Sequence, residues 1–184
     1  MATWNFDPTH TYASFSARHM MVTTVRGRFD APSAGKLEFD PANPAATQVE
    51  ATLNAASVNT GFADRDNHLK SPDFLDVANY PTITFKSTRV ELTGDDTAKL
   101  HGDLTIRNVT RPVVFNVEFL GITNDPWGGK RAGFSAETKI NREDWGLTWN
   151  VAIEAGGVLV GKDIKLNLDV EAILIPETES TLQA

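Results

Sequence analysis

The alternation of apolar and polar side chains between residues 98 and 121 limits what this chain can fold into more than any other feature. The apolar or small positions are even-numbered in the first half and odd-numbered in the second: Leu100, Gly102, Leu104, Ile106, Val113, Phe115, Val117 and Phe119. Because side chains alternate across a β-strand, each half predicts a strand with one dry face and one wet face. Residues 108–112 carry turn chemistry, and Pro112 cannot donate to a central ladder. We therefore expect an antiparallel hairpin that turns over these residues.

The same two-residue period continues along most of the chain. It recurs in the segments 11–19, 47–54, 81–86, 132–140 and 162–175, with shorter extended pieces at 3–6, 25–29 and 36–40. The phase slips after residue 86, which predicts a β-bulge near Ser87 and Thr88. Strands with a single dry face must close on themselves or stack in two sheets, and about eight of them suit a meandering barrel. The sequence therefore predicts an all-β fold.

A few short stretches depart from this period. Residues 62–69 have helical spacing and follow cap residues, which predicts a helix. Ser71 and Pro72 predict a second short helix over residues 71–75, with proline at its first position. A single helical turn is also expected at 141–146. One or two short helices should therefore accompany the sheet.

Composition excludes several classes of protein. The chain has 184 residues, enough for one domain, and no cysteine, which is consistent with a reducing compartment. Its formal net charge of −7 argues against sequence-independent nucleic-acid binding and weakly against docking on an anionic membrane. The start of the chain lacks a basic n-region and an apolar h-region, and no apolar run reaches the ~20 residues of a membrane span. We expect a cytoplasmic protein, periplasmic only if a leader was removed.

The predicted dry faces mix large aromatic residues with small ones such as Ala13, Ala51 and Ala136. Small residues among large ones leave room for a ligand. A packed sandwich core without a ligand explains the same pattern about equally well, so the residues alone leave both alternatives open.

Several motifs follow one another in a specific order: Asp7-Pro8-Thr9-His10 with Phe15 and His19, Gly27 with Phe29, Arg65-Asp66 with His68-Leu69, Phe74, Tyr80-Pro81 with Phe85, Gly102-Asp103-Leu104-Thr105-Ile106 with Thr110 and Pro112, Gly133-Phe134, and Arg142 with Gly146. Over residues 3–175 this order resembles the YceI-like family, also described as polyisoprenoid-binding and lipocalin-like. The resemblance implies one domain over residues 1–176, an extended antiparallel lipocalin-like β-barrel around a long apolar pore that holds an isoprenoid chain. It also suggests a homodimer. Residues 177–184 should form a disordered tail.

With this resemblance, we expect the chain to bind a long apolar lipid, most simply a polyisoprenoid or a quinone-type chain, as a carrier, a store or a sensor. No other cofactor and no metal are expected. The predicted ligand-binding residues are Phe15, His19, Phe39, Phe74, Phe85, Leu104, Phe115, Phe119, Phe134, Trp145, Leu166 and Leu168. Arg65 and His68 are candidates for contacting the polar head group at the pore mouth.

An enzyme acting on such a lipid is the alternative, with Arg65, Asp66 and His68 as acid, base or charge clamp. A hydrogen-bonded helix that anchors one end of the barrel explains the same three residues more simply. The third hypothesis is a structural or interaction domain with a solid core.

The four histidines lack the short, patterned spacing of a zinc site. His10 and His19 are expected to cap a barrel end through hydrogen bonds, and His101 should face solvent. The sequence therefore predicts no metal site.

Overall fold

A computed structural model describes residues 1–154 and 156–176. The tail predicted at 177–184 lies outside the described residues. The described residues form ten strands: β1 (Ala2–Phe6), β2 (Tyr12–His19), β3 (Thr23–Phe29), β4 (Ala34–Phe39), β5 (Gln48–Asn54), β6 (Thr82–Leu92), β7 (Thr97–Ile106), β8 (Val109–Asn124), β9 (Lys130–Asn141) and β10 (Val160–Leu174). They are accompanied by one α-helix, α1 (Ala63–Lys70), and by the short 3-10 helices η1 (Pro44–Ala46), η2 (Ala55–Ser57) and η3 (Arg142–Trp145).

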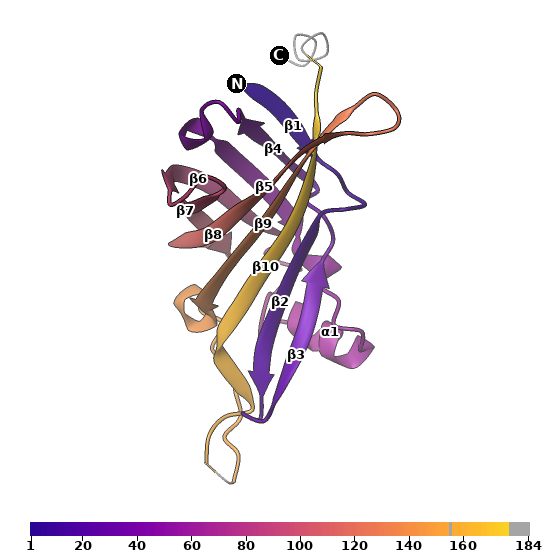
Figure 1. The fold of residues 1–184 in the computed structure, drawn as a ribbon. Helices are drawn as coiled ribbons and strands as arrows, with labels where there is room; N and C mark the ends of the chain where they lie inside the picture. Colours follow the sequence, from indigo (N-terminus) through magenta and orange to yellow (C-terminus); the bar gives the residue numbers. More distant parts are fainter. Residues whose placement is uncertain (155, 177–184) are drawn as a thin grey trace.

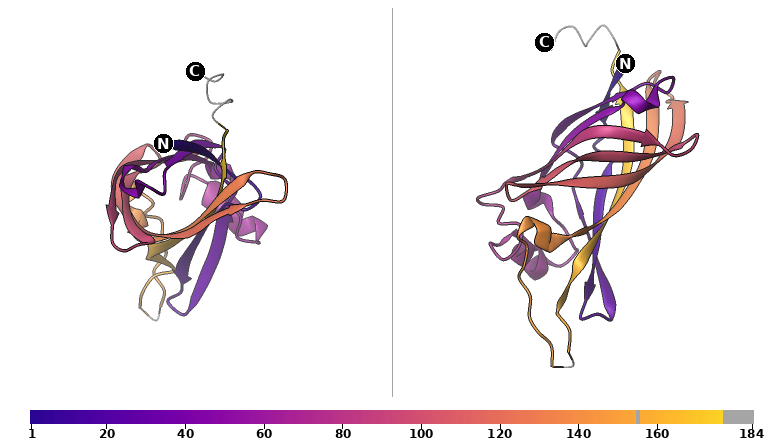
Figure 2. Two further views of the ribbon diagram at one scale, coloured as in Figure 1. Left: turned by 45° about the horizontal axis from the view of Figure 1, so that its top comes forward. Right: turned by 90° about the vertical axis from the view of Figure 1, so that its left-hand side faces the viewer.

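Eight of these strands close into a barrel (Figure 1). The strands are ordered β1-β4-β5-β6-β7-β8-β9-β10, and a further pairing of β1 with β10 completes the ring. Viewed obliquely from above, the strands run around a ring (Figure 2). Every pairing in it is antiparallel. The predicted all-β, lipocalin-like antiparallel barrel of about eight strands with a short helix is confirmed.

The long strand β10 has two different partners on one side. Its residues 172–174 pair with β1, and its residues 160–169 pair with β2. The hairpin of β2 and β3 therefore continues the wall below β1 and forms the lower part of the molecule in Figure 1. A bridge between Arg28 and Asn59 connects β3 to the segment before α1.

The hairpin of β7 and β8 is confirmed in its register, which places Leu100 opposite Phe115 and Gly102 opposite Val113. The turn predicted over 108–112 is wrong, because Arg107 and Asn108 make the whole turn, with φ of 51° and 59°. Pro112 lies within β8, opposite Asp103. The missing N–H is tolerated there because β8 pairs with β9 only from Asn116 onward.

The predicted bulge is confirmed by a shift in register between Ser87 and Arg89. The second helix predicted at 71–75 is wrong: this segment is a series of tight turns. The Ser71 hydroxyl donates to the carbonyl of His68 (2.7 Å) at the end of α1 and accepts from the Asp73 amide (3.3 Å) as a helix cap would, but no helix follows. Asp76 then adopts a positive φ of 48° and reverses the chain. The helical turn expected at 141–146 is present as η3.

Two apolar clusters fill parts of the barrel. The upper one contains Trp4, Leu37, Phe39, Ala132 and Ala172. The lower one is larger and consists of Ala55, Val58, Phe74, Leu75, Ile83, Leu104, Val113, Phe115, Trp145 and Leu147. Each cluster satisfies its indole donor on a strand carbonyl, as in the bond from Trp4 Nε1 to Phe39 O (3.2 Å).

No helix among the described residues is long and apolar enough to cross a membrane.

Candidate ligand-binding cavity

A cavity of about 770 Å³ occupies the barrel interior. Its wall takes side chains from nearly every strand and from α1, and it extends from Pro41 and Pro44 after β4 to His19 and Leu159 at the other end. This volume lies in the upper part of the range of about 300–1,000 Å³ typical of small-molecule sites. The cavity contradicts the alternative of a solid core.

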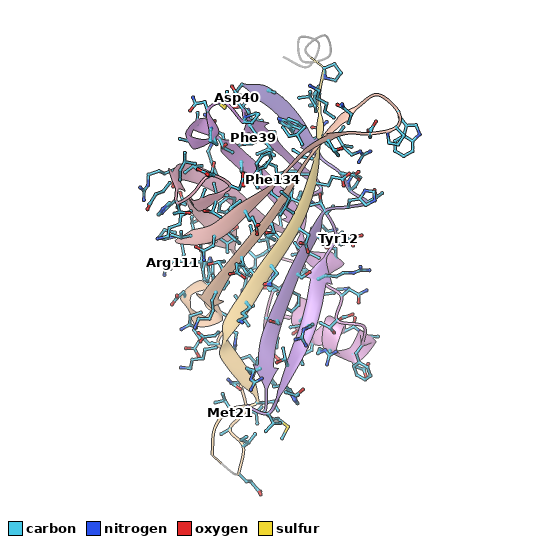
Figure 3. All side chains as sticks on the ribbon, viewed as in Figure 1. Tyr12, Met21, Phe39, Asp40, Arg111 and Phe134 are labelled. Carbon is cyan, nitrogen blue, oxygen red and sulfur yellow. The ribbon has the colours of Figure 1, made fainter. Side chains whose placement is uncertain are left out.

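All residues that the sequence suggested as ligand contacts lie in the cavity wall. They are Phe15, His19, Phe39, Phe74, Phe85, Leu104, Phe115, Phe119, Phe134, Trp145, Leu166 and Leu168. The two head-group candidates, Arg65 and His68, also line it. Figure 3 labels two of these, Phe39 and Phe134, in the upper half of the barrel. Their contact with a ligand stays a prediction.

Two pairs of phenylalanine rings in the wall pack edge to face, and other pairs are tilted. Phe85 and Phe115 have ring centroids 5.5 Å apart at 87°, and Phe39 and Phe134 are 5.1 Å apart at 85°. Such contacts fix the orientation of the rings. The wall is therefore built from side chains that hold one another in place.

The glycines of the wall have a different role from the one we expected of small residues. A Cβ on Gly102 would lie 2.4 Å from the Phe85 ring, and a Cβ on Gly27 would lie 2.4 Å from the Phe15 ring. The rings lie directly on these glycines and use the space that the missing side chains leave. Gly102 and Gly27 thus allow bulky rings to lie against the wall and do not themselves widen the cavity.

His68 lies among aromatic residues where α1 meets the lower cluster. Its ring is edge-on to Trp149 (4.5 Å between centroids) and to Phe74 (5.0 Å). Its Nε2 is 2.9 Å from Asp73 Oδ2. This packing orients the imidazole at the cavity wall. It accommodates a polar ring next to the apolar side chains of Phe74 and Leu69.

Arg65 and Asp66 both hold the loop that precedes α1. Arg65 donates from Nε to the Thr60 hydroxyl (2.7 Å) and from Nη2 to the Thr60 carbonyl (3.1 Å). Asp66 Oδ1 accepts from the Thr60 amide (2.8 Å) and hydroxyl (2.6 Å), and the hydroxyl bond is the main cause that lowers the Asp66 pKa. Asp66 is not part of the cavity wall. This geometry fits the anchoring role better than a catalytic group of Arg65, Asp66 and His68.

Arg142 lies in the cavity wall but is not among the ligand contacts that the sequence predicts. It is only 4% exposed, lines the cavity and lies 5.8 Å from the centre of the Phe74 ring. Its guanidinium donates to three carbonyls, those of Leu147, Val160 and Gly161. Burial lowers its pKa. Arg142 thereby ties together the two ends of the segment 147–161.

A second charged group lies between β1, β9 and β10. Arg131 forms ion pairs with Asp7, Asp125 and Glu171. Burial alone raises the Asp7 pKa, but hydrogen bonds from Thr9, His10 and Arg131 outweigh it and hold that pKa well below its usual range. The same carboxylates raise the pKa of Arg131. This group is an ion-pair network in the barrel wall.

The histidines lie apart from one another, so they do not form a common site. His10 Nδ1 bonds to Asp7 Oδ2 (3.1 Å) beside the Arg131 network, and the His19 ring makes no hydrogen bond within the described part of the chain. The prediction that these two histidines cap a barrel end through hydrogen bonds is therefore wrong for His19. Asp7, His10 and Glu171 place ligand atoms within 4.8 Å of one another. Arg131 already neutralises both of these carboxylates, which disfavours a cation there. His101 lies on the outer face, next to Arg89 and Glu91.

The sequence profile of the YceI-like domain matches residues 4–172. The chain belongs to the YceI-like family. Protein YceI of Escherichia coli is 41% identical over 164 residues, which are 89% of this chain and 82% of that protein. The crystal structure of the Campylobacter jejuni YceI protein is 33% identical, with a TM-score of 0.73 over 87% of this chain and 90% of that one.

A more distant structure shares the fold of this YceI-like chain. It is described as a polyisoprenoid binding domain from Saccharophagus degradans, implicated in plant cell wall breakdown. The two chains are 15% identical, with a TM-score of 0.66 over 95% of this chain and 99% of the other. At this identity the likeness shows the barrel architecture alone.

Proposed function

We propose that this YceI-like protein binds a long apolar lipid, a polyisoprenoid or a quinone-type chain, inside its barrel. The observation that carries the proposal is the cavity of about 770 Å³, whose wall consists mainly of aliphatic and aromatic side chains. A polar ligand loses its hydrogen bonds to water when it enters such a cavity, and few groups of the wall can replace them. The cavity therefore favours a hydrocarbon ligand. The shared fold with a polyisoprenoid binding domain supports the same ligand class.

The energetics suit such a ligand. Burial contributes about 0.8 kcal/mol per CH₂, so one five-carbon prenyl unit contributes roughly 3–4 kcal/mol before ordering costs. Several units in sequence bind tightly without any charged contact. The residues Phe15, Phe85 and Phe115 act in this proposal by excluding water.

The head group is the polar end of this ligand, and Arg65 and His68 are its proposed contacts. Thr60 uses Nε and Nη2 of Arg65, and Asp73 uses Nε2 of His68. Arg65 Nη1 and His68 Nδ1 make no hydrogen bond within residues 1–154 and 156–176, which leaves two donor or acceptor sites for a hydroxyl, a carbonyl or a phosphate. These contacts would orient the lipid, so the protein is proposed to be a binder and not a catalyst.

A homodimer is proposed on separate grounds. Leu120 is 62% exposed, and Trp127 and Ile122 of the same β8–β9 hairpin are also exposed. A second copy of this chain covering these side chains would remove them from water. Sedimentation velocity of wild type against Leu120→Lys checks this: a dimer that the substitution dissociates supports the interface, and a monomeric wild type contradicts it.

Native mass spectrometry of freshly purified protein tests the binding proposal. A co-purified lipid of defined mass, released by organic solvent and identified by fragmentation, is the expected result. Repeated preparations without any bound mass, together with no uptake of added polyprenol or quinone, would contradict it. His68→Ala should retain the lipid with at most a modest loss in affinity, whereas conversion of the lipid by wild type but not by this variant would indicate an enzyme.

A further inference from the structure

The net charge of the chain is −7, but its charged side chains are distributed unevenly over the surface. The register of the lower sheet places Lys139, Lys165, Ser16 and Arg26 in one row across β9, β10, β2 and β3. All four positions are out of phase with the cavity-lining residues, so their side chains lie on the outer face. Arg28 lies on the same outer face of β3, two residues further along. The lower outer face is therefore rich in cations.

The carboxylates of this region only partly neutralise it. Asp163 pairs with Lys139 (3.4 Å), and Glu143 pairs with Lys162 (3.1 Å). Arg18, Arg26, Arg28 and Lys165 form no ion pair within the described part of the chain. Glu137 lies on this outer face too, in the register row of Arg28, and Glu154, on the neighbouring loop, is an exposed anion in the same region. The balance on this face is positive although the whole chain is acidic.

The opposite end of the barrel has the reverse sign. Asp95 and Asp96 at the β6–β7 turn line the cavity beside the upper cluster, where the Phe119 amide donates to Asp96 O (2.7 Å). Asp40 directly follows Phe39, and Figure 3 shows it at the end of the molecule remote from Met21. The protein is thus electrically polarised along the barrel, with its positive face at the end that carries Met21.

This end also carries exposed apolar side chains, which we call the tip: Met20 (43% exposed), Met21 (61%), Val22 (79%) and Val151 (48%). Backbone bonds join the two loops that carry them, from Met20 N to Leu159 O (2.8 Å) and from Leu159 N to Val151 O (2.9 Å). The tip is therefore one connected surface. Isolated apolar residues are common on surfaces, but four together at a protruding end are not.

The turn at the tip uses residues that its backbone disfavours. Met20 and Met21 have φ of 49° and 62°, and the Val22 amide closes the turn on His19 O (3.2 Å). Asn and Gly are the usual residues in such a turn, since long side chains are strained at positive φ. Two methionines here lower the local stability and leave flexible apolar side chains in water. An apolar environment around these side chains would offset that loss of stability, and the isolated chain does not provide one.

We propose that the tip inserts into the interfacial region of a bilayer that contains anionic phospholipids, while Arg18, Arg26, Arg28 and Lys165 contact the head groups. Apolar side chains surrounded by cations are the combination that binds such surfaces, because burial and electrostatic attraction add together. The acidic opposite end turns away from the membrane and sets the orientation.

Docking in this orientation would bring the lower end of the cavity to the lipid. His19, Leu159 and Val160 line the cavity and lie beside the tip. A lipid could then pass between the bilayer and the barrel without crossing water. This consequence rests on the proposed function, whereas the docking itself does not.

Co-sedimentation with vesicles tests the proposal, using vesicles of equal parts phosphatidylglycerol and phosphatidylcholine against vesicles of phosphatidylcholine alone. We expect wild type to bind the anionic vesicles and to be released by salt. Met20→Asn with Met21→Gly removes the apolar side chains and supplies residues that suit the turn, so this variant should fold at least as well and lose vesicle binding. Arg26→Gln with Arg28→Gln should weaken binding roughly 30-fold, and Glu154→Gln should strengthen it several-fold.

Lys99→Gln with Lys130→Gln is the charge-matched control, because both lysines are exposed and lie away from the tip. It should bind as wild type does. Wild type that does not sediment with anionic vesicles at low salt would overturn the proposal, as would equal losses in the control and in the Arg26 and Arg28 variant. Docking by protein that carries no lipid and takes none up would refute the proposed function and leave the docking intact.

Discussion

Gly102 lies directly beneath the ring of Phe85, so closely that a Cβ on the glycine would be 2.4 Å from Phe85 Cζ and 2.6 Å from the carbonyl oxygen of Lys86. The ring lines the cavity, so room for it to shift lies toward the interior, while the carbonyl belongs to the β6 backbone. Gly102→Ala should therefore lower the free energy of unfolding by about 1–3 kcal/mol, as overpacking does in other cores. It should also narrow the cavity, and urea denaturation with ligand mass analysis would measure both effects.

Gly133→Ala is the matched control for that substitution. Its Cβ would meet only Leu120, at an ordinary contact distance of 3.4 Å, and Gly133 has no positive φ. We expect a change within about 0.5 kcal/mol, typical of an unstrained surface site. If Gly102→Ala and Gly133→Ala lowered the free energy of unfolding equally, the Phe85 contact would not explain the effect of Gly102→Ala.

Phe115→Trp tests whether the cavity sets the length of the bound chain. Phe115 is almost fully buried in the wall and packs edge-on against Phe85. A larger ring at this place reduces the volume open to a ligand, so the population of bound lipids should shift to shorter chains by mass spectrometry. Val114→Trp, on the outward face of the same strand, should leave the population unchanged. Identical lipids in wild type and Phe115→Trp would show that the ligand does not lie against Phe115.

The strands and the cavity wall could be predicted because both depend on local alternation. The pairing of β1 with β10 that closes the barrel could not be predicted. It places Trp4 opposite Leu174, and nothing in either strand specifies a partner so far along the chain. The helix predicted at 71–75 failed for a local reason. The Ser71 hydroxyl does accept from Asp73 N, but the next backbone amides bond as turns, with both Phe74 N and Asp76 N donating to Ser71 O.

The sequence contains a signal that places Arg142 in the cavity wall. Arg142 continues the even-numbered phase of Phe134, Ala136 and Ile140, which face the cavity, so the alternation itself placed this arginine inward. A charged residue in an inward phase indicates a buried group with specific partners. The three carbonyls that it contacts belong to a segment without a clear period, and for that reason no sequence pattern identified them.

Replacing Arg142 should loosen the segment 147–161. Arg142→Met keeps the length of the side chain but leaves the carbonyls of Leu147, Val160 and Gly161 without this donor, and we expect a loss of about 2–4 kcal/mol in the free energy of unfolding. Hydrogen exchange should rise most in residues 147–161. Arg142→Lys keeps the charge, but its single ammonium cannot replace the guanidinium fork, so it should recover only part of the loss. Full recovery by lysine would show that charge, and not the three-way contact, is what matters.

The ion pairs around Arg131 predict a loss of stability in acid. The pKa of Asp7 is held well below its usual range in the folded protein, and that of Asp125 is also lowered, chiefly by the Gly129 amide. A carboxyl whose folded pKa is depressed stabilises the fold above its unfolded pKa of about 3.9 and loses that contribution as the pH falls toward the folded value. Stability from urea denaturation should therefore decline below about pH 4. Asp7→Asn should be less stable than wild type at neutral pH and show a flatter decline in acid, whereas Asp103→Asn, which removes an exposed carboxylate from β7, should follow the wild-type curve. A decline in acid that is as steep in Asp7→Asn as in wild type would place its origin outside this network.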